Sequence, residues 1–359
     1  MRNSFNFPGK VSTDNYSERD FEDFENILVI HSDSALVNGS IENLKLIIEQ
    51  QNIDFYNTSI LENPNSITED RFLFNDKNYD ALIVIGGGTQ IDIAKIVLAK
   101  LILGKKWSEA IKLGSGMALK RATKFIVLCT LPGSGAESSK AAVLNSLSGK
   151  NIFTSNFFLP DNIFYDTKSI EKVDSFNLLL RLIDSFSHSY DAKNTLLANE
   201  FSSAYSEYLE NNSLSLFEDF YKIRNNQLTS KQIRFLCVNS FYGGLSQSET
   251  GSGFGHALAH TLESEFGTIH AESVFLSLLV KAEYMQDEAL LKKLSAVYKN
   301  LFGLDNVKKH KEILKKLNIK DFLDRSRKDP CWKLERSKID VGQITQILEK
   351  KVEEGKWNI

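Results

Sequence analysis

Residues 79–95 read YDALIVIGGGTQIDIAK. The apolar run at 79–85 predicts a buried parallel strand, and the spacing of apolar residues from 91 to 103 predicts a helix directly after it. The glycines between them, Gly86, Gly87 and Gly88, permit a sharp turn and a close approach of a ligand to the backbone. The free N–H groups at a helix N-terminus attract phosphate. The stretch predicts a phosphate-binding loop at these glycines and Thr89, although a plain strand–helix turn has the same form.

Strand-like and helix-like segments alternate through the first half of the chain. Short apolar runs predict further strands at 26–30, 54–60, 125–131 and 162–166, and helical spacing predicts a helix at 41–51. This alternation predicts an α/β domain with a doubly wound, mostly parallel sheet. Beyond about Thr167 the sequence has helical spacing and few strand-like runs. The predicted domains are therefore an α/β dinucleotide-binding domain at 1–167 and an all-helical metal-binding and catalytic domain at 168–359.

A second glycine-containing loop, TLPGSGAES at 130–138, follows the next strong strand. Ligands of open α/β sheets bind at the carboxyl ends of strands, so two such loops suggest one extended ligand, a nucleotide. Thr130, Leu131 and Ser134 are the predicted cofactor contacts in this loop. Asp92 and Lys95, on the first turn of the helix after the first loop, are predicted to fix that loop or to reach phosphate or ribose.

Histidines concentrate in the middle of the helical half. Asp184 and His188 are four residues apart, as are His256 and His260, and His270 follows after a short break. Side chains four residues apart share a helix face. Three imidazoles with one carboxylate suit Fe²⁺ or Zn²⁺. The alternative is a pair of helices whose histidines are buried and hydrogen-bonded without a metal.

Several motifs together resemble the iron-containing (group III) alcohol dehydrogenases, which belong to the dehydroquinate synthase-like superfamily. The matching segments, within about residues 25–275, are GGGTQIDIAK at 86–95, TLPGSGAE at 130–137, LPDNIFYD at 159–166, Asp184-x3-His188 and His256-x3-His260-x9-His270. The resemblance implies an α/β domain followed by an all-α domain. It also implies a metal-dependent, NAD(P)-linked oxidoreductase that interconverts a small alcohol and its aldehyde or ketone.

The resemblance assigns roles to individual residues. The metal, most often Fe²⁺ with Zn²⁺ as the alternative, would be held by Asp184, His188, His256 and His270. His260 would stand beside the nicotinamide as a proton-relay candidate, and Lys150 would line the site.

The choice between NAD and NADP stays open in the sequence. Ser32 aligns with an aspartate that binds the ribose in NAD-preferring relatives, and Asp33 follows it. Either Asp33 contacts the ribose hydroxyls, or the serines leave room for a 2′-phosphate.

Three departures from the family pattern bear on the substrate pocket. Glu263 and Ala271 replace glycines, and the proline expected soon after His270 is absent. We expect the bulk and charge of Glu263 to make the pocket unusual. The alternative functions are a sugar-phosphate cyclase or carbon–oxygen lyase, a phosphorylated-polyol dehydrogenase, and a non-catalytic nucleotide-binding protein.

Composition excludes several classes of function. The net charge of −3 gives no basic surface for nucleic acid, and no apolar run reaches the ~20 residues of a membrane span. The three cysteines are widely spaced, which argues against a disulfide framework or a cysteine zinc site. The first residues lack the apolar core of a signal peptide. We therefore expect a cytoplasmic protein and, by analogy with the family, a homodimer.

Overall fold

A computed structural model describes most of the chain as two compact units. The described residues are 9–14, 16–61, 64–69, 77–113, 122–146, 149–222, 228–302 and 304–357. One unit, called here the α/β unit, comprises Ser4–Asp174 and Thr229–Gly244, and the other, the helical unit, comprises Ser175–Leu228 and Leu245–Ile359. The division thus lies a few residues beyond the predicted boundary, and a segment from the middle of the second half joins the α/β unit.

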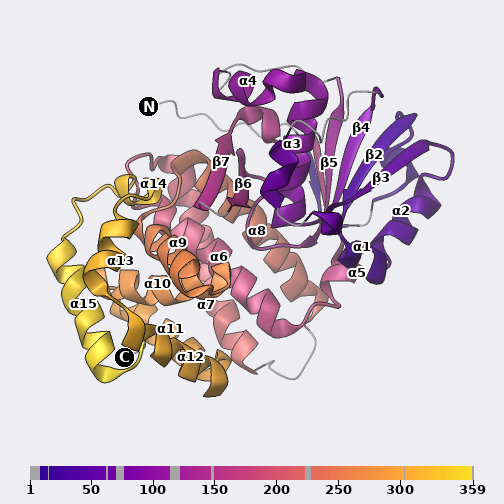
Figure 1. The fold of residues 1–359 in the computed structure, drawn as a ribbon. Helices are drawn as coiled ribbons and strands as arrows, with labels where there is room; N and C mark the ends of the chain where they lie inside the picture. The colour runs from indigo at the N-terminus through magenta and orange to yellow at the C-terminus, as the bar shows by residue number, and fades with distance from the viewer. Residues whose placement is uncertain are drawn as a thin grey trace. The chain divides into compact units, whose positions relative to one another are not determined.

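The α/β unit is built on a six-stranded sheet in which all paired strands are parallel (Figure 1). In spatial order the strands are β1 (Lys10–Ser12), β8 (Asn162–Tyr165), β5 (Lys124–Leu131), β4 (Ala81–Gly87), β2 (Asn26–His31) and β3 (Asn52–Asn57). The predicted parallel, doubly wound sheet is confirmed.

Both faces of this sheet are buried. Successive residues of a strand point to opposite faces, so each central strand contributes side chains to both of them. On one face, Val29 and Ile83 pack with Ile41 and Leu44 of α2 (Ser40–Ile47). On the other face, α3 (Gly88–Leu103) contacts β2, β4 and β5. Burial on both faces explains why these strands are continuous apolar runs rather than alternating ones.

The strand order reverses at β2, since β3 lies on one side of it and β4 on the other. In the register of the β2–β4 pair, His31 lies opposite Ile85. The residues that follow these two strands, Ser32 and Gly86, therefore leave the same edge of the sheet next to each other. Such a switch point is where open α/β sheets bind nucleotides.

The remaining elements of the α/β unit are short. They are β6 (Ala141–Ser146) and β7 (Gly149–Thr154), which form an antiparallel hairpin, the helices α1 (Asp33–Val37), α4 (Trp107–Leu113) and α5 (Thr167–Ile170), and the 3₁₀ helices η1 (Glu18–Asp20), η2 (Thr58–Ile60), η3 (Pro64–Thr68), η4 (Gly104–Lys106) and η5 (Asn156–Phe158). The division between the units falls within α8 (Ser230–Thr250).

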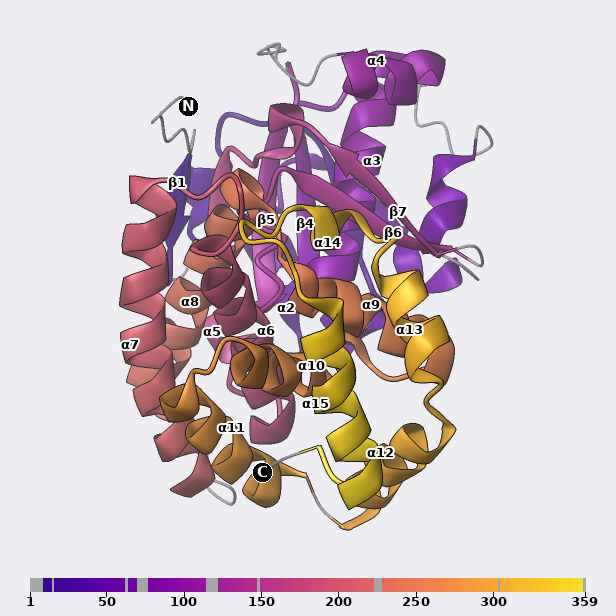
Figure 2. The same cartoon turned by 90° about the vertical axis from the view of Figure 1, so that its left-hand side faces the viewer.

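The helical unit is organised around α10 (His270–Tyr284), whose residues from Ala271 to Ala282 are all buried. This helix packs against α6, α9, α11 and α15, and α15 can be followed beside it in Figure 2. The other helices are α6 (Ser175–Ala192), α7 (Glu200–Lys222), α9 (Phe254–Phe266), α11 (Glu288–Leu301), α12 (Leu304–Lys316), α13 (Ile319–Ser326), α14 (Pro330–Lys333) and α15 (Val341–Glu354). Among the described residues, no helix is both long and apolar enough to cross a membrane.

Candidate metal centre and nucleotide-binding edge

Four side chains from three helices of the helical unit lie close together: ligand atoms of Asp184, His256 and His270 are within 4.8 Å of one another, and His188 adjoins Asp184. Asp184 and His188 come from α6, His256 from α9, and His270 is the first residue of α10. Asp184 Oδ1 lies 3.7 Å from His188 Nε2, 3.9 Å from His256 Nε2 and 3.7 Å from His270 Nε2. The i,i+4 spacing on α6 places Asp184 and His188 on one face, as the sequence predicts.

Several polar atoms of Asp184, His188 and His256 lack hydrogen-bond partners among the described residues. Both oxygens of Asp184, Nδ1 of His188 and Nε2 of His256 are buried and unbonded among the described residues. A buried carboxylate without hydrogen bonds is strongly unfavourable unless a cation or another donor compensates it. The three Nε2 atoms surround Asp184 Oδ1 at separations close to those between ligands ~2.1 Å from one ion. These residues therefore fit a divalent metal.

The electrostatics of the site agree with this fit. Burial alone would raise the pKa of the Asp184 carboxyl, but the imidazoles of His270, His188 and His256 lower it below its usual value. Burial lowers the pKa of His188 to about 3, so its ring is neutral at physiological pH. An ionised carboxylate beside a neutral imidazole is the protonation state that binds a metal.

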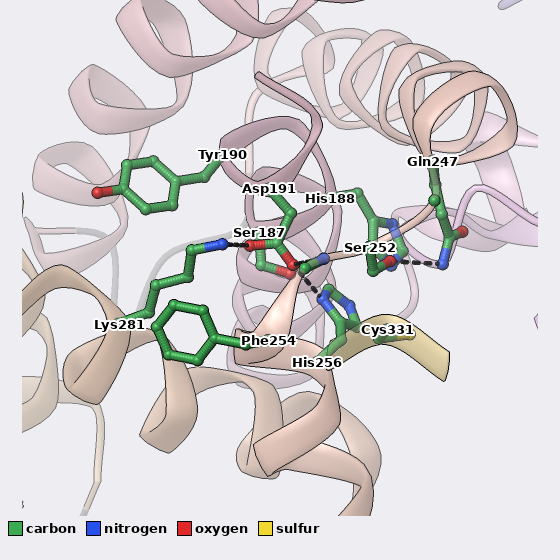
Figure 3. Close-up of polar contacts among 12 residues, drawn as sticks. Ser187, His188, Tyr190, Asp191, Gln247, Ser252, Phe254, His256, Lys281 and Cys331 are labelled. Atoms are coloured by element: carbon green, nitrogen blue, oxygen red, sulfur yellow. Dashed lines mark hydrogen bonds and ion pairs between the residues drawn. The ribbon is translucent and has the colours of Figure 1, made fainter. Parts of the chain in front are cut away.

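The buried carboxylate of Asp191 contacts the Nδ1 side of the His256 ring and orients it (Figure 3). His256 Nδ1 is 2.8 Å from Asp191 Oδ2, whose other oxygen is 2.6 Å from Lys281 Nζ. Lys281 also contacts Glu335 Oε2 at 3.1 Å. Burial alone would raise the pKa of Asp191, but Lys281 and His256 lower it below its usual value. Because Nδ1 donates to Asp191, the lone pair of His256 Nε2 faces Asp184 and is available to a metal.

His260 lies next to the candidate ligand His270 but contacts a different carboxylate, that of Asp329. Its ring centroid is 5.7 Å from that of His270, and its Nδ1 is 2.8 Å from Asp329 Oδ2. Asp329 and Cys331 lie close enough to His260 to form a second group of possible ligands. Asp329 is already engaged, however, since its Oδ1 accepts the N–H of Cys331. This second group has no buried unbonded ligand atom among the described residues, so it lacks the feature that marks the first.

In the α/β unit, the first glycine loop forms the turn from β4 into α3. A Cβ on Gly86 would meet Gln90, one on Gly87 would lie 3.2 Å from Leu131 Cβ, and one on Gly88 would lie 2.5 Å from Ser134 Oγ. The two glycine loops are therefore closely packed, and a larger residue at Gly88 would require Ser134 to shift. Thr89, in the first turn of α3, is exposed. The free N–H groups of this helix end are available to a phosphate.

Asp92 and Lys95 hold the segment after the second loop. Lys95 Nζ donates to the carbonyls of Ala136, Ser139 and Ala141 at 2.7, 3.0 and 2.5 Å. The backbone N–H of Val143 donates to Asp92, and burial raises the pKa of this carboxyl to about 6. Lys95 thus holds the end of the second glycine loop, and its predicted role in fixing the first loop stays a prediction. A direct contact between Lys95 and a phosphate stays a prediction, and all three of its donors are engaged within the protein.

The end of β2 carries the residues considered for ribose recognition. Ser32 is buried and its Oγ lies 2.7 Å from Ser34 Oγ, whereas Asp33 is exposed. The side-chain amide of Asn57, at the end of β3, donates to Asp33 Oδ1 at 2.6 Å. This bond holds the Asp33 carboxylate at the switch point.

Residues 13–167 match the family model described as iron-containing alcohol dehydrogenase. Long-chain-alcohol dehydrogenase 1 of Geobacillus thermodenitrificans is 24% identical over 284 residues, which span 78% of this chain and 71% of that protein.

Solved structures extend the likeness over the whole fold. The iron-containing alcohol dehydrogenase of Thermotoga maritima has a TM-score of 0.71 at 19% identity and covers 97% of this chain and 99% of its own. The sulfoacetaldehyde reductase of Bifidobacterium kashiwanohense, solved in complex with NAD⁺, has a TM-score of 0.75 at 14% identity and covers 98% of both chains. These likenesses confirm the predicted fold class.

The family resemblance led to expectations for Lys150 and Glu263. Lys150 lies in β7, but its side chain is outside the described residues, so its role stays a prediction. Glu263 lies close to the candidate site, since its Oε2 is 3.1 Å from His270 Nδ1. Its expected effect on the substrate pocket stays a prediction.

The carboxylates that contact the histidines of the candidate site were not predicted from the sequence. Asp191 and Asp329 contact histidines 65 and 69 positions away. In the second loop, Glu137 is buried and its Oε1 accepts from Tyr165 Oη at 2.8 Å and from Ser240 Oγ of α8 at 2.6 Å. Asp191 had a detectable signal, since it lies seven residues after Asp184 on the same face of α6.

Proposed function

We propose that this protein is a metal-dependent alcohol dehydrogenase that transfers a hydride reversibly between NAD and a small alcohol or its aldehyde. The observation that carries the proposal is the carboxylate of Asp184, buried without a hydrogen bond and surrounded by three imidazole Nε2 atoms. That arrangement is suited to a divalent cation. Fe²⁺ is the metal we propose from the family, with Zn²⁺ as the alternative.

Asp184, His188, His256 and His270 would hold the metal. When bound, it supplies Lewis-acid stabilisation of the negative charge that develops on the substrate oxygen. Asp191 and Lys281 keep His256 in the tautomer that binds through Nε2. The burial of Asp184 and His188 excludes water from the ligand side of the site, which strengthens the electrostatic interactions there.

The cofactor would be bound by the α/β unit. The N-terminus of α3, with Gly86, Gly87, Gly88 and Thr89, is suited to the pyrophosphate. Thr130, Leu131 and Ser134 belong to the adjoining loop. We propose NAD rather than NADP, because the exposed Asp33 carboxylate can accept hydrogen bonds from ribose hydroxyls and would repel a 2′-phosphate.

His260 is the proposed proton carrier. Its Nδ1 donates to Asp329, which leaves Nε2 as the atom that exchanges a proton with substrate or water. Asp329 would also stabilise the charged imidazolium. Replacement of His260 should therefore lower the rate without removing the metal.

The test is NADH oxidation with a panel of short aldehydes, using protein purified without oxygen, stripped with a chelator, and reloaded with Fe²⁺ or Zn²⁺. We expect activity only after reloading, loss of metal and activity in H256A, and loss of activity with retained metal in H260A. Full activity of the stripped protein would refute the metal's role. A reaction without net change in NADH would indicate a cyclase or lyase instead.

Two further predictions concern cofactor choice and assembly. D33A should weaken NAD binding and raise the ratio of NADP to NAD affinity, as measured by titration. The homodimer and the cytoplasmic location stay predictions from the family and the composition. Light scattering of the purified protein tests the dimer, and a single-chain mass would refute it.

A further inference from the structure

We infer that Glu263 is a positioning residue that holds His270 in place for the metal, an inference that rests on the metal centre of the proposed function. Glu263 Oε2 lies 3.1 Å from His270 Nδ1, and His270 Nε2 lies 3.7 Å from Asp184 Oδ1. The two ring nitrogens of His270 therefore face two different carboxylates, one on each side.

His270 is the predicted ligand that most needs support. Its side chain is 28% exposed, whereas those of His188 and His256 are each 3% exposed. It is also the first residue of α10, directly after a turn whose residue Ile269 is exposed. The packed interior fixes the other two rings, but fewer neighbours restrict the ring of His270.

The fold places Glu263 where it can supply that support. Glu263 lies seven residues after His256 on α9, so both side chains project from the same face of the helix. Gly267 ends α9 with φ of 62°, in the left-handed region, and its N–H donates to the carbonyl of Glu263 at 3.0 Å. This turn reverses the chain so that α10 begins beside the last turns of α9.

The contact has a chemical consequence for the ligand. A carboxylate that accepts the Nδ1–H of a histidine fixes the tautomer, orients the ring and makes Nε2 more basic. Asp191 does this for His256 from a fully buried position. Glu263 does the same for His270 from the partly exposed side of the site. A glycine, which the family pattern has at this position, cannot form the bond.

The experiment compares E263A, E263Q and the control E265Q in zinc-loaded and cobalt-loaded protein. Glu265 lies on the same turn of α9 but pairs with Arg325 rather than with a ligand. The release of Zn²⁺ to a colorimetric chelator gives a rate, and the visible spectrum of the Co²⁺ protein reports the geometry of the ligands. We expect release about 10-fold or more faster in E263A, less so in E263Q, and a shifted Co²⁺ spectrum in both.

E265Q should match the wild type in both measurements. Wild-type release rates and spectra in E263A and E263Q would overturn the inference while leaving the proposed function intact. Faster release in E265Q as well would assign the effect to the stability of α9 and would also overturn it. If the protein binds metal tightly and E263A has the expected effects, but no dehydrogenase activity is found, the proposed function is refuted and the inference about Glu263 stands. A wild-type protein that binds no metal would refute both.

Discussion

The Nδ1 atom of His256 lies 2.8 Å from Oδ2 of Asp191, and both side chains are buried. This contact joins the candidate ligand His256 to a buried network of charged side chains that continues through Lys281 to Glu335. Asp191 Oδ2 also accepts the N–H of Gly253, the residue directly before α9. One carboxylate therefore orients a ligand and anchors the start of the helix that carries it.

Replacement of Asp191 by Asn should weaken metal binding by about 10- to 100-fold, because the amide is a poorer acceptor for His256 Nδ1. Competition with a chelator of known affinity measures the effect on folded protein. D329N is the matched control, since Asp329 contacts His260, which is not a predicted ligand. Equal metal affinities in D191N and the wild type would contradict this role of Asp191.

Replacement of Asp184 by Asn should remove most of the stabilisation that a bound metal gives to the protein. The amide has no charge to offset a divalent cation, so the variant should bind it more weakly. We expect Zn²⁺ to raise the melting temperature of stripped wild type by about 4 °C or more above the rise seen in stripped D184N, as measured by scanning calorimetry. Equal rises in both proteins would contradict the role of Asp184 as a ligand.

Replacement of Lys95 by Met should lower the free energy of unfolding by about 3 kcal/mol or more, because three carbonyls lose their donor and Asp92 loses its counter-charge. Chemical denaturation measures the loss. The control is K124M, which removes an exposed ion pair with Asp161 and should change stability by less than about 1 kcal/mol. Similar losses in both variants would mean that the bonds of Lys95 contribute little.

Replacement of Glu272 by Gln should destabilise the protein in a pH-dependent way. Burial alone would raise the pKa of Glu272, but His310 and Lys309 lower it below its usual value. The folded state therefore favours the ionised form, so this stabilisation is complete above the unfolded pKa and is lost as the pH falls through the folded pKa.

The free energies of unfolding of the wild type and E272Q should accordingly differ by about 1–3 kcal/mol at pH 7 and converge as the pH falls below about 4. Denaturation at a series of pH values measures both. A difference that does not change with pH would contradict an ionised Glu272 in the folded state.

Much of the α/β unit could be predicted from the sequence. The runs at 79–85 and 125–131 are apolar throughout, because helices cover both faces of the sheet, and they coincide closely with β4 and β5. Strand β1 was missed because it has three residues and none of them is buried. The contribution of α8 to the α/β unit depends on packing between residues about a hundred positions apart, such as Ser138 and Phe241, which no local pattern reveals.

The candidate ligands Asp184 and His188 could be predicted as a pair because helical spacing places them on one face of α6. Their carboxylate partners were harder to find, since Asp191 and Asp329 reach their histidines from other helices or loops. For Glu263, residue type alone predicted a charge close to the site. Its contact with His270 depends on the turn at Gly267, which no local pattern reveals.

The proposed metal site is tested most directly by anomalous X-ray scattering from crystals of the iron-loaded protein, recorded on both sides of the iron absorption edge. We predict one strong peak per chain, ~2.0–2.2 Å from a carboxylate oxygen of Asp184 and from Nε2 of His188, His256 and His270. A peak at other residues, or none at these four in a protein that turns over NAD, would contradict it.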